Sequence, residues 1–179
     1  MYLALINVNA NHQIGGKNMK NLKALVIDVD GTLTNGSICI GDSGTQFTQF
    51  HVRDGYAIKE LLPELEIAPI VISERKSKMI EEWCHDFGIS VILQDVEDKY
   101  ESMMSVLNEM GISKEATAYV GDDLNDLECM KHVGLKACPN DAVDEIKNIA
   151  DYVSSKDAGH GALRDFIDWI RRNKKQIDL

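Results

Sequence analysis

The sequence predicts an α/β fold: a doubly wound, mostly parallel sheet with helices on both faces. Short, continuously apolar runs recur along the chain, as expected for strands that are buried on both sides. Amphipathic stretches of helical length separate these runs. Such alternation is typical of parallel sheets, because each parallel strand needs a crossover connection, usually a helix. A length of 179 residues corresponds to one domain.

The apolar runs give the expected strands, and the helical patterns lie between them. The first run, Ala24–Ile27, ends directly at Asp28. Further strands are expected at Ala68–Ile72, Ser90–Leu93, Ala116–Val120 and Leu135–Cys138. Helices are expected at Gly55–Leu62, Ser77–Phe87, Lys99–Met110, Leu124–Lys131, Ala142–Asn148 and Gly161–Arg172. The last helix has one apolar face and ends in basic residues, which suit the negative end of a helix dipole.

One segment interrupts the alternation. Residues 37–50 contain two short β-prone runs around a turn that begins at Gly41 and ends at Gly44. This pattern predicts a small β-hairpin inserted after the first strand, where it could cover a site. We expect the domain to span residues 20–179. Residues 1–19 are expected to form a loosely ordered leader, since they lack the basic start and the cleavage site of a signal peptide.

Composition excludes several classes of partner. The chain has 19 Lys+Arg and 29 Asp+Glu, a formal net charge of −10, which argues against a nucleic-acid or anionic membrane surface. No apolar run approaches the roughly 20 residues of a membrane helix. The four cysteines show no C-x-x-C spacing, so we expect reduced thiols and a cytoplasmic protein.

Chemistry-bearing side chains gather where the expected strands end, which is where doubly wound sheets bind ligands. Asp28 and Asp30 follow the first strand and, as alternate residues of an extended segment, point the same way. One carboxylate can attack a substrate while the other transfers a proton. Asp28 and Asp122 offer the hard oxygen ligands that Mg²⁺ takes. Ser73 and Lys99 are donors suited to the charge on a transferring phosphoryl group.

This constellation resembles the haloacid dehalogenase superfamily of phosphohydrolases. The four motifs of that superfamily appear in order, as Asp28-Val29-Asp30-Gly31-Thr32, Ser73, Lys99 and Gly121-Asp122-Asp123-Leu124-Asn125-Asp126. The resemblance implies that Asp28 is a nucleophile forming an aspartyl-phosphate and that Asp30 is the general acid/base. It implies that Ser73 and Lys99 orient the phosphoryl group. Mg²⁺ would be held by Asp28, the backbone carbonyl of Asp30, and Asp122, with Asp123 in the outer shell.

Longer segments are similar to the small, cap-less branch of that superfamily, namely residues 30–36, 50–55, 119–126 and 159–165. The branch includes 3-deoxy-D-manno-octulosonate 8-phosphate phosphatases, nonulosonate (N-acylneuraminate or KDN) 9-phosphate phosphatases, and a domain fused to CMP-sialate synthetases. The resemblance implies a Mg²⁺-dependent phosphomonoester hydrolase acting on a phosphorylated 2-keto-3-deoxy sugar acid, 3-deoxy-D-manno-octulosonate 8-phosphate first among them. It also implies a homotetramer in which the 37–50 hairpin and a neighbouring subunit cover the site.

Three departures keep the nine-carbon substrate as an alternative. The second motif reads Ser73-Glu74-Arg75-Lys76, where the octulosonate enzymes usually have Thr-Gly-Arg-Lys, and it looks more like the synthetase-associated domain. His51 stands where those enzymes usually carry Asn, and Trp83 stands for an Arg that touches substrate. The carbon number of the sugar therefore stays open.

Substrate contacts are expected from a group near the hairpin and the second motif: His51, Arg53, Asp54, Gly55, Lys59 and Arg75. The basic members would supply the positive charge that an acidic chain needs for an anionic sugar, although Lys59 is nearly as well explained as a solvated side chain. Asp126 is expected either to orient Lys99 or to lie on the surface. Ile38 and Ile40 are expected to bury against a partner rather than in the core.

Two other function classes are weaker. A receiver-type signalling domain also combines acidic residues, a Ser/Thr and a Lys, but it places the phosphorylated Asp after the third strand, whereas Asp28 follows the first. A non-catalytic oligomerisation module is disfavoured because Asp28, Asp30, Lys99 and Asp122 are all retained.

Overall fold

Six parallel strands form one sheet in the computed structural model, which describes residues 19–176. The order is β5-β4-β1-β6-β7-β8, and neighbouring strands are parallel throughout. The strands are β1 (Ala24–Ile27), β4 (Ala68–Ile72), β5 (Val91–Leu93), β6 (Thr117–Val120), β7 (Leu135–Cys138) and β8 (Tyr152–Val153). Apart from Met19, the expected leader lies outside the described residues. Met19 itself is buried in the core.

Helices cover both faces of the sheet, which confirms the predicted doubly wound fold. One face carries α3 (Lys78–Asp86), α7 (Ala162–Gln176) and a continuous helical stretch made of α1 (Val52–Tyr56), η3 (Ala57–Leu61) and α2 (Leu62–Glu64). The other face carries α4 (Lys99–Met110), α5 (Leu127–His132) and α6 (Asp144–Ile149). Alternate residues of β1 divide between the two cores: Leu25 faces the first, and Val26 the second.

Several element boundaries differ from the sequence-based expectation, and three differences have a clear physical reason. The first helix begins at Val52 rather than Gly55, because the His51 ring caps it by accepting a hydrogen bond from the Arg53 amide. The helix expected at Leu124–Lys131 starts as a tight turn, η5 (Leu124–Asp126), before α5 begins. Strand β8 was not predicted, since two residues carry no recognisable period.

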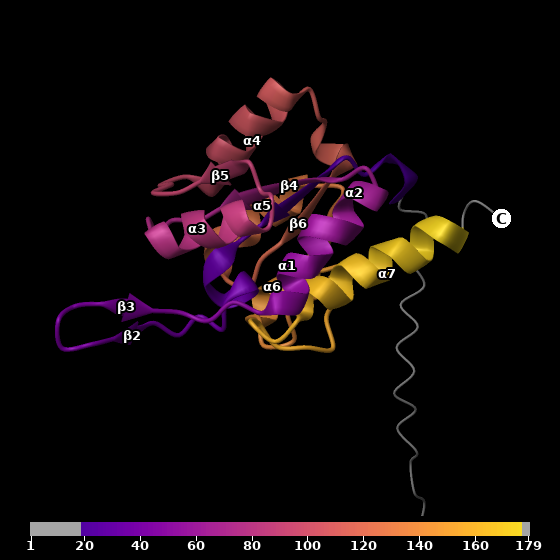
Figure 1. Ribbon diagram of the computed structural model, residues 1–179. Coiled ribbons are helices and arrows are strands. Elements are labelled where there is room, and N and C mark those ends of the chain that lie inside the picture. The colour runs from indigo at the N-terminus through magenta and orange to yellow at the C-terminus, as the bar shows by residue number, and fades with distance from the viewer. Residues whose placement is uncertain (1–18, 177–179) are drawn as a thin grey trace, which may run out of the picture.

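The expected hairpin is present and projects from the body of the molecule (Figure 1). Its ladder joins β2 (Cys39–Ile40) to β3 (Gln46–Phe47), shorter than the two runs suggested. At its base, an isolated bridge pairs Thr34 with Phe50. Within residues 19–176, no helix is both long and apolar enough to cross a membrane.

Candidate active site

The predicted catalytic residues meet at the carboxyl edge of the three central strands. Asp28 follows β1, Ser73 follows β4, and Asp122 lies two residues beyond β6. Because β4, β1 and β6 are parallel neighbours, their carboxyl ends lie side by side. Lys99 is the first residue of α4, which follows β5 on the same edge. Strand order alone therefore brings together four residues separated by up to 94 positions in sequence (122 − 28 = 94).

Asp28 is a buried carboxylate held by a buried lysine. The Lys99 ammonium donates to Asp28 Oδ1 at 2.6 Å and to Asp126 Oδ1 at 2.8 Å. Asp28 and Lys99 are each 4% exposed, and Asp126 is fully buried. Burial lowers the pKa of Lys99, but the charges of the two carboxylates outweigh it and raise that pKa above its ordinary value. Lys99 is therefore a fixed cation beside the candidate nucleophile.

Asp122 lies against the turn that follows β1. That turn, η2 (Val29–Leu33), contains Gly31 at φ = +93°, a conformation that favours glycine. A β-carbon at Gly31 would come within 2.1 Å of Asp122 Oδ2, so the carboxylate occupies the space that glycine leaves. The Thr32 hydroxyl donates to Asp122 Oδ1 at 3.0 Å. Gly31 and Thr32 of the D-x-D-G-T segment thus determine where the Asp122 carboxylate lies.

The electrostatics of this edge call for a cation. Burial, and next the charge of Asp126, raise the pKa of Asp28 well above its usual range and the pKa of Asp122 to about 6. Carboxylate oxygens of Asp28, Asp122 and Asp126 lie within 4.8 Å of one another, while Lys99 supplies one positive charge among them. The donor set, oxygen atoms alone, fits a hard divalent ion such as Mg²⁺.

Asp126 rather than Asp123 completes this trio. The structure realises the first of the two roles weighed for Asp126, since it binds Lys99. Asp123, expected in the outer shell of the metal, is exposed, and its carboxylate accepts from the Leu124 amide at 2.6 Å as the cap of η5. In the sequence, only the i,i+4 spacing of Asp122 and Asp126 hinted that the two carboxylates could meet. That spacing predicts a contact only when the η5 turn between them is known.

Asp30, Ser73 and Arg75 are linked by hydrogen bonds beside the site; Ser73 is buried, whereas Asp30 and Arg75 are partly exposed. Arg75 Nε donates to Asp30 Oδ2 at 2.8 Å, and Nη2 donates to the other oxygen. The Ser73 hydroxyl accepts from the Arg75 amide at 3.2 Å, which sets the turn after β4. Arg75 was expected to contact substrate, and in this structure its partner is Asp30.

The other expected substrate contacts are spread more widely. Arg53 is an exposed residue beside the half-buried His51. The Asp54 carboxylate turns to the start of α7, where it accepts from the Arg164 amide at 2.7 Å. Gly55 packs on the Phe87 ring. Lys59 donates to the carbonyl of Asp86 at the far end of α3, so the structure does not bring it to the carboxylates.

Aromatic packing accounts for the unusual Trp83. Its ring stacks on Phe50 at 4.7 Å between centroids and contacts Phe87 at 4.9 Å. Phe50 ends the hairpin, so Trp83 anchors the base of the hairpin to α3. The side chain that departs from the octulosonate pattern is therefore structural on at least one face.

The projecting hairpin exposes apolar side chains. Ile40 is 70% exposed and Phe47 is 60% exposed, with Ile38 also exposed. Val52 and Tyr56 add apolar surface on α1, at the foot of the hairpin. Tyr56 is partly covered by the Arg164 guanidinium, 5.4 Å from its ring centroid. The exposure of Ile38 and Ile40 agrees with the expectation that they do not belong to the core.

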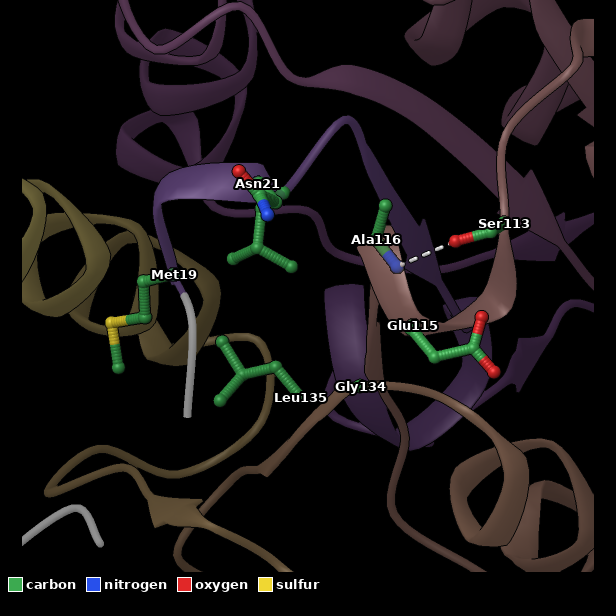
Figure 2. A pocket seen from close by; sticks show the side chains of 8 residues that line it. Met19, Asn21, Ser113, Glu115, Ala116, Gly134 and Leu135 are labelled. Atoms are coloured by element: carbon green, nitrogen blue, oxygen red, sulfur yellow. Dashed lines mark hydrogen bonds between the residues drawn. The ribbon is translucent and has the colours of Figure 1, made fainter. Parts of the chain in front are cut away.

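A separate cavity of about 340 Å³ lies at the opposite edge of the sheet (Figure 2). Its lining residues precede or begin strands: Leu22 comes before β1, Ala116 before β6, and Leu135 opens β7. The Ala116 amide is satisfied by the Ser113 hydroxyl at 3.3 Å. No group of carboxylates converges there among the lining residues, so we assign the chemistry to the carboxyl edge.

Comparisons with known proteins agree with this geometry. The family model for haloacid dehalogenase-like hydrolases matches residues 72–166. The 3-deoxy-D-manno-octulosonate 8-phosphate phosphatase of Escherichia coli strain K12 is 36% identical over 160 residues, covering 89% of this chain and 84% of that protein. The Haemophilus influenzae protein of the same name is 34% identical over 152 residues, covering 85% and 84%.

Solved structures give the same picture. The Moraxella catarrhalis 3-deoxy-D-manno-octulosonate 8-phosphate phosphatase, solved with a magnesium ion, a phosphate ion and a KDO molecule, superposes with a TM-score of 0.84. It is 30% identical and covers 89% of this chain and 91% of its own. A cobalt-bound phosphatase from Haemophilus influenzae has a TM-score of 0.83 at 33% identity, covering 88% and 91%.

Proposed function

This chain belongs to the haloacid dehalogenase-like hydrolases, and we propose that it is a Mg²⁺-dependent phosphatase that hydrolyses 3-deoxy-D-manno-octulosonate 8-phosphate through an aspartyl-phosphate. The observation that carries the proposal is the position of Asp28. It is a buried carboxylate at the end of the central strand, between a fixed lysine and a second acidic group, with Asp30 two residues away.

The residues support a two-step displacement. In the first step an Asp28 oxygen attacks phosphorus, the bond from phosphorus to the sugar oxygen breaks, and Asp30 gives its proton to that oxygen. In the second step Asp30 takes a proton from water, which attacks the aspartyl-phosphate and releases inorganic phosphate and the Asp28 carboxylate. Arg75 must release Asp30 before either proton transfer, because its guanidinium occupies both carboxylate oxygens.

The groups around Asp28 would handle the charge of the phosphoryl group. Lys99 and the Ser73 hydroxyl lie at the same strand edge and would donate to phosphoryl oxygens. Asp28, Asp122 and the backbone carbonyl of Asp30 would hold Mg²⁺, with Asp123 near its water shell. Bound there, the ion would supply the positive charge that draws the phosphate to the acidic edge.

The names of the relatives and the local charge support the proposed substrate class. The similar proteins are named for 3-deoxy-D-manno-octulosonate 8-phosphate, and one structure contains the sugar itself. Besides Lys99, Arg75 is a basic residue at the edge of the site, and Arg53 lies beside the hairpin. We propose that they meet the sugar-acid carboxylate and phosphate once substrate displaces the pairing with Asp30.

The same proposal includes the assembly and the cellular location. A cap-less site needs a cover, and the exposed hairpin is the element available, so we propose a homotetramer closed through residues 37–50. Four free cysteines, three of them buried, support a reducing compartment such as the cytoplasm.

A substrate panel tests the function. The purified chain is assayed for phosphate release from 3-deoxy-D-manno-octulosonate 8-phosphate, from nine-carbon keto-acid 9-phosphates and from p-nitrophenyl phosphate, with Mg²⁺ and with EDTA. We expect the highest kcat/KM on the eight-carbon acid, and no turnover in EDTA. A higher kcat/KM on a nine-carbon acid would move the assignment to the nonulosonate phosphatases, the alternative that the departures at Glu74, His51 and Trp83 leave open.

The mechanism is tested separately with Asp28→Asn. An amide is a poor nucleophile, so turnover is expected to fall by several orders of magnitude in the folded variant. Turnover within a few-fold of the wild type would exclude the aspartyl-phosphate.

A further inference from the structure

Tyr119 is a buried tyrosine that the mechanism above does not use. It lies in β6, is fully buried, and its hydroxyl donates to Asp126 Oδ1 at 2.6 Å. The same oxygen accepts from the Lys99 ammonium at 2.8 Å. Tyr119 and Lys99 therefore share one acceptor atom, Asp126 Oδ1, and Lys99 also binds the candidate nucleophile Asp28.

Asp126 is held on both oxygens. While Oδ1 receives Tyr119 and Lys99, Oδ2 accepts from the Asp122 amide at 2.9 Å. With its oxygens taken by the protein, Asp126 serves as a holder of Lys99, although it is near enough to Asp28 and Asp122 to join a metal site.

Lys99 lies between two carboxylates that compete for it. Its ammonium is 2.6 Å from Asp28 Oδ1 and 2.8 Å from Asp126 Oδ1. In a buried site of low dielectric, a second donor on Asp126 reduces the pull of that carboxylate on the ammonium. Without the tyrosine hydroxyl, the full charge of Asp126 Oδ1 would draw Lys99 away from Asp28.

We propose that Tyr119 is a positioning residue, which acts through Asp126 to keep the Lys99 ammonium on Asp28. This inference rests on the proposed phosphatase function. The hydroxyl neither touches the reacting atoms nor binds the metal. It sets how one lysine is shared between two aspartates, and so how much positive charge faces the transferring phosphoryl group.

The chain contains a matched control. Tyr152, on β8, also donates its hydroxyl to an aspartate, Asp165 Oδ2, at 2.8 Å. That pair joins the last strand to α7 and lies apart from the carboxyl edge of β1 and β6. Tyr119→Phe and Tyr152→Phe thus remove the same chemical group from the same kind of contact, inside and outside the site.

The kinetic test uses p-nitrophenyl phosphate at saturating Mg²⁺. We expect Tyr119→Phe to lower kcat about tenfold, as for loss of one hydrogen bond to a charged group, while KM and the Mg²⁺ half-saturation change less than about twofold. Tyr152→Phe should keep kcat within about twofold of the wild type. In an Asp126→Asn background, Tyr119→Phe should cause no further loss, because its partner charge is gone. Equal losses in the two tyrosine variants, or additive losses with Asp126→Asn, would overturn the proposal.

A spectroscopic test is independent of turnover. The ¹H–¹⁵N signal of the Lys99 ammonium, assigned by its absence in Lys99→Arg, should shift in Tyr119→Phe and stay in place in Tyr152→Phe. If the Lys99 ammonium signal does not shift in Tyr119→Phe, the positioning role is refuted, even if the chain is an active phosphatase. A wild-type chain that releases no phosphate from any ester would instead refute the proposed function, whatever the lysine signal shows.

Discussion

Arg75 forms a bidentate pair with the carboxylate of Asp30: Nε donates to Oδ2 at 2.8 Å, and Nη2 donates to Oδ1. The pair is partly exposed, with 20% of the arginine side chain and 28% of the aspartate side chain accessible. Exposure keeps such a pair weak enough to exchange partners. An anionic substrate can therefore take the guanidinium and leave Asp30 free for proton transfer.

The first prediction concerns Asp30. Asp30→Asn removes the general acid/base but leaves the backbone carbonyl proposed to bind the metal. We expect kcat to fall about 10²–10⁴-fold on the sugar phosphate, with the Mg²⁺ half-saturation within a few-fold of the wild type. Steady-state kinetics over a Mg²⁺ titration measure both quantities. A collapse of metal affinity with an intact rate at saturating Mg²⁺ would contradict the assigned roles.

Arg75→Ala tests the role of Arg75, the partner of Asp30, separately from the role of Asp30 as general acid/base. Loss of the guanidinium should raise KM for the sugar acid phosphate about tenfold or more, because a charged contact to the substrate is gone. Hydrolysis of p-nitrophenyl phosphate should suffer less, since that ester has no sugar-acid carboxylate. Lys76→Ala, the adjacent exposed cation, serves as the control for a general change in surface charge.

The second prediction compares two adjacent aspartates. Asp122 sits in the trio of carboxylates, whereas Asp123 is exposed and caps η5. Asp122→Asn should raise the Mg²⁺ concentration for half-maximal activity about a hundredfold or abolish activity, because an amide is a poor ligand for a hard cation. Asp123→Asn should shift it by no more than about tenfold, the effect expected of an outer-shell group. Equal effects would place Asp123 in direct contact with the metal.

The strands were the most predictable part of this fold. Continuous apolar runs located Ala24–Ile27 and Ala68–Ile72 to the residue, because burial on both faces favours apolar side chains. Leu135–Cys138 was also located to the residue, although the half-buried Lys136 interrupts its apolar run. The shared edge followed from the rule that parallel strands end together. The hairpin was signalled by its glycines, although its ladder is shorter than its apolar runs.

The parts of the site that depend on turns and helix faces were less accessible. Lys59 and Asp54 both lie on the helix that starts at Val52, but one reaches α3 and the other the start of α7. Sequence spacing does not say which way a helix face points until the neighbouring helices are placed. The pairing of Asp126 with Tyr119 likewise needed the η5 turn, which returns the carboxylate to β6.

The third prediction concerns pH and Asp54. Burial raises the pKa of this carboxyl from 3.8 to about 6, although the Arg164 and Gly161 amides act in the opposite direction. The folded chain then binds more protons than the unfolded chain between these values, so this group lowers the free energy of unfolding as pH rises through the window. The difference in free energy of unfolding between Asp54→Asn and the wild type should therefore shift in favour of the variant by up to about 3 kcal/mol from pH 4 to pH 7. Urea unfolding in EDTA at both pH values measures the gain.

Asp165 is a comparison for Asp54, because its pKa shifts in the opposite direction. Burial raises the pKa of Asp165, but hydrogen bonds from Tyr152 and the Ser155 amide outweigh it and lower the pKa below 3.8. The stability that Asp165 contributes is present above its unfolded pKa and is lost as pH falls toward the folded value. Asp165→Asn should therefore lose stability at pH 7 rather than gain it. The same pH slope in both variants would show that Asp54 is not the source.

The last prediction concerns the hairpin. Ile40 in β2 is 70% exposed and Ile38, just before that strand, is 41% exposed, so both offer apolar area to a second copy. A two-stranded hairpin is marginal in water by itself, and pairing with other subunits would stabilise it. Replacing both residues with Asp should convert a tetramer into smaller species in sedimentation and raise KM for the sugar phosphate. Hydrolysis of p-nitrophenyl phosphate should change little, because Asp28 and Lys99 are untouched. Ser43→Asp in the exposed turn adds charge without removing apolar area and should leave the assembly intact. A wild-type chain that sediments as a monomer with undiminished selectivity for the sugar phosphate would refute the role of the hairpin as a shared cover.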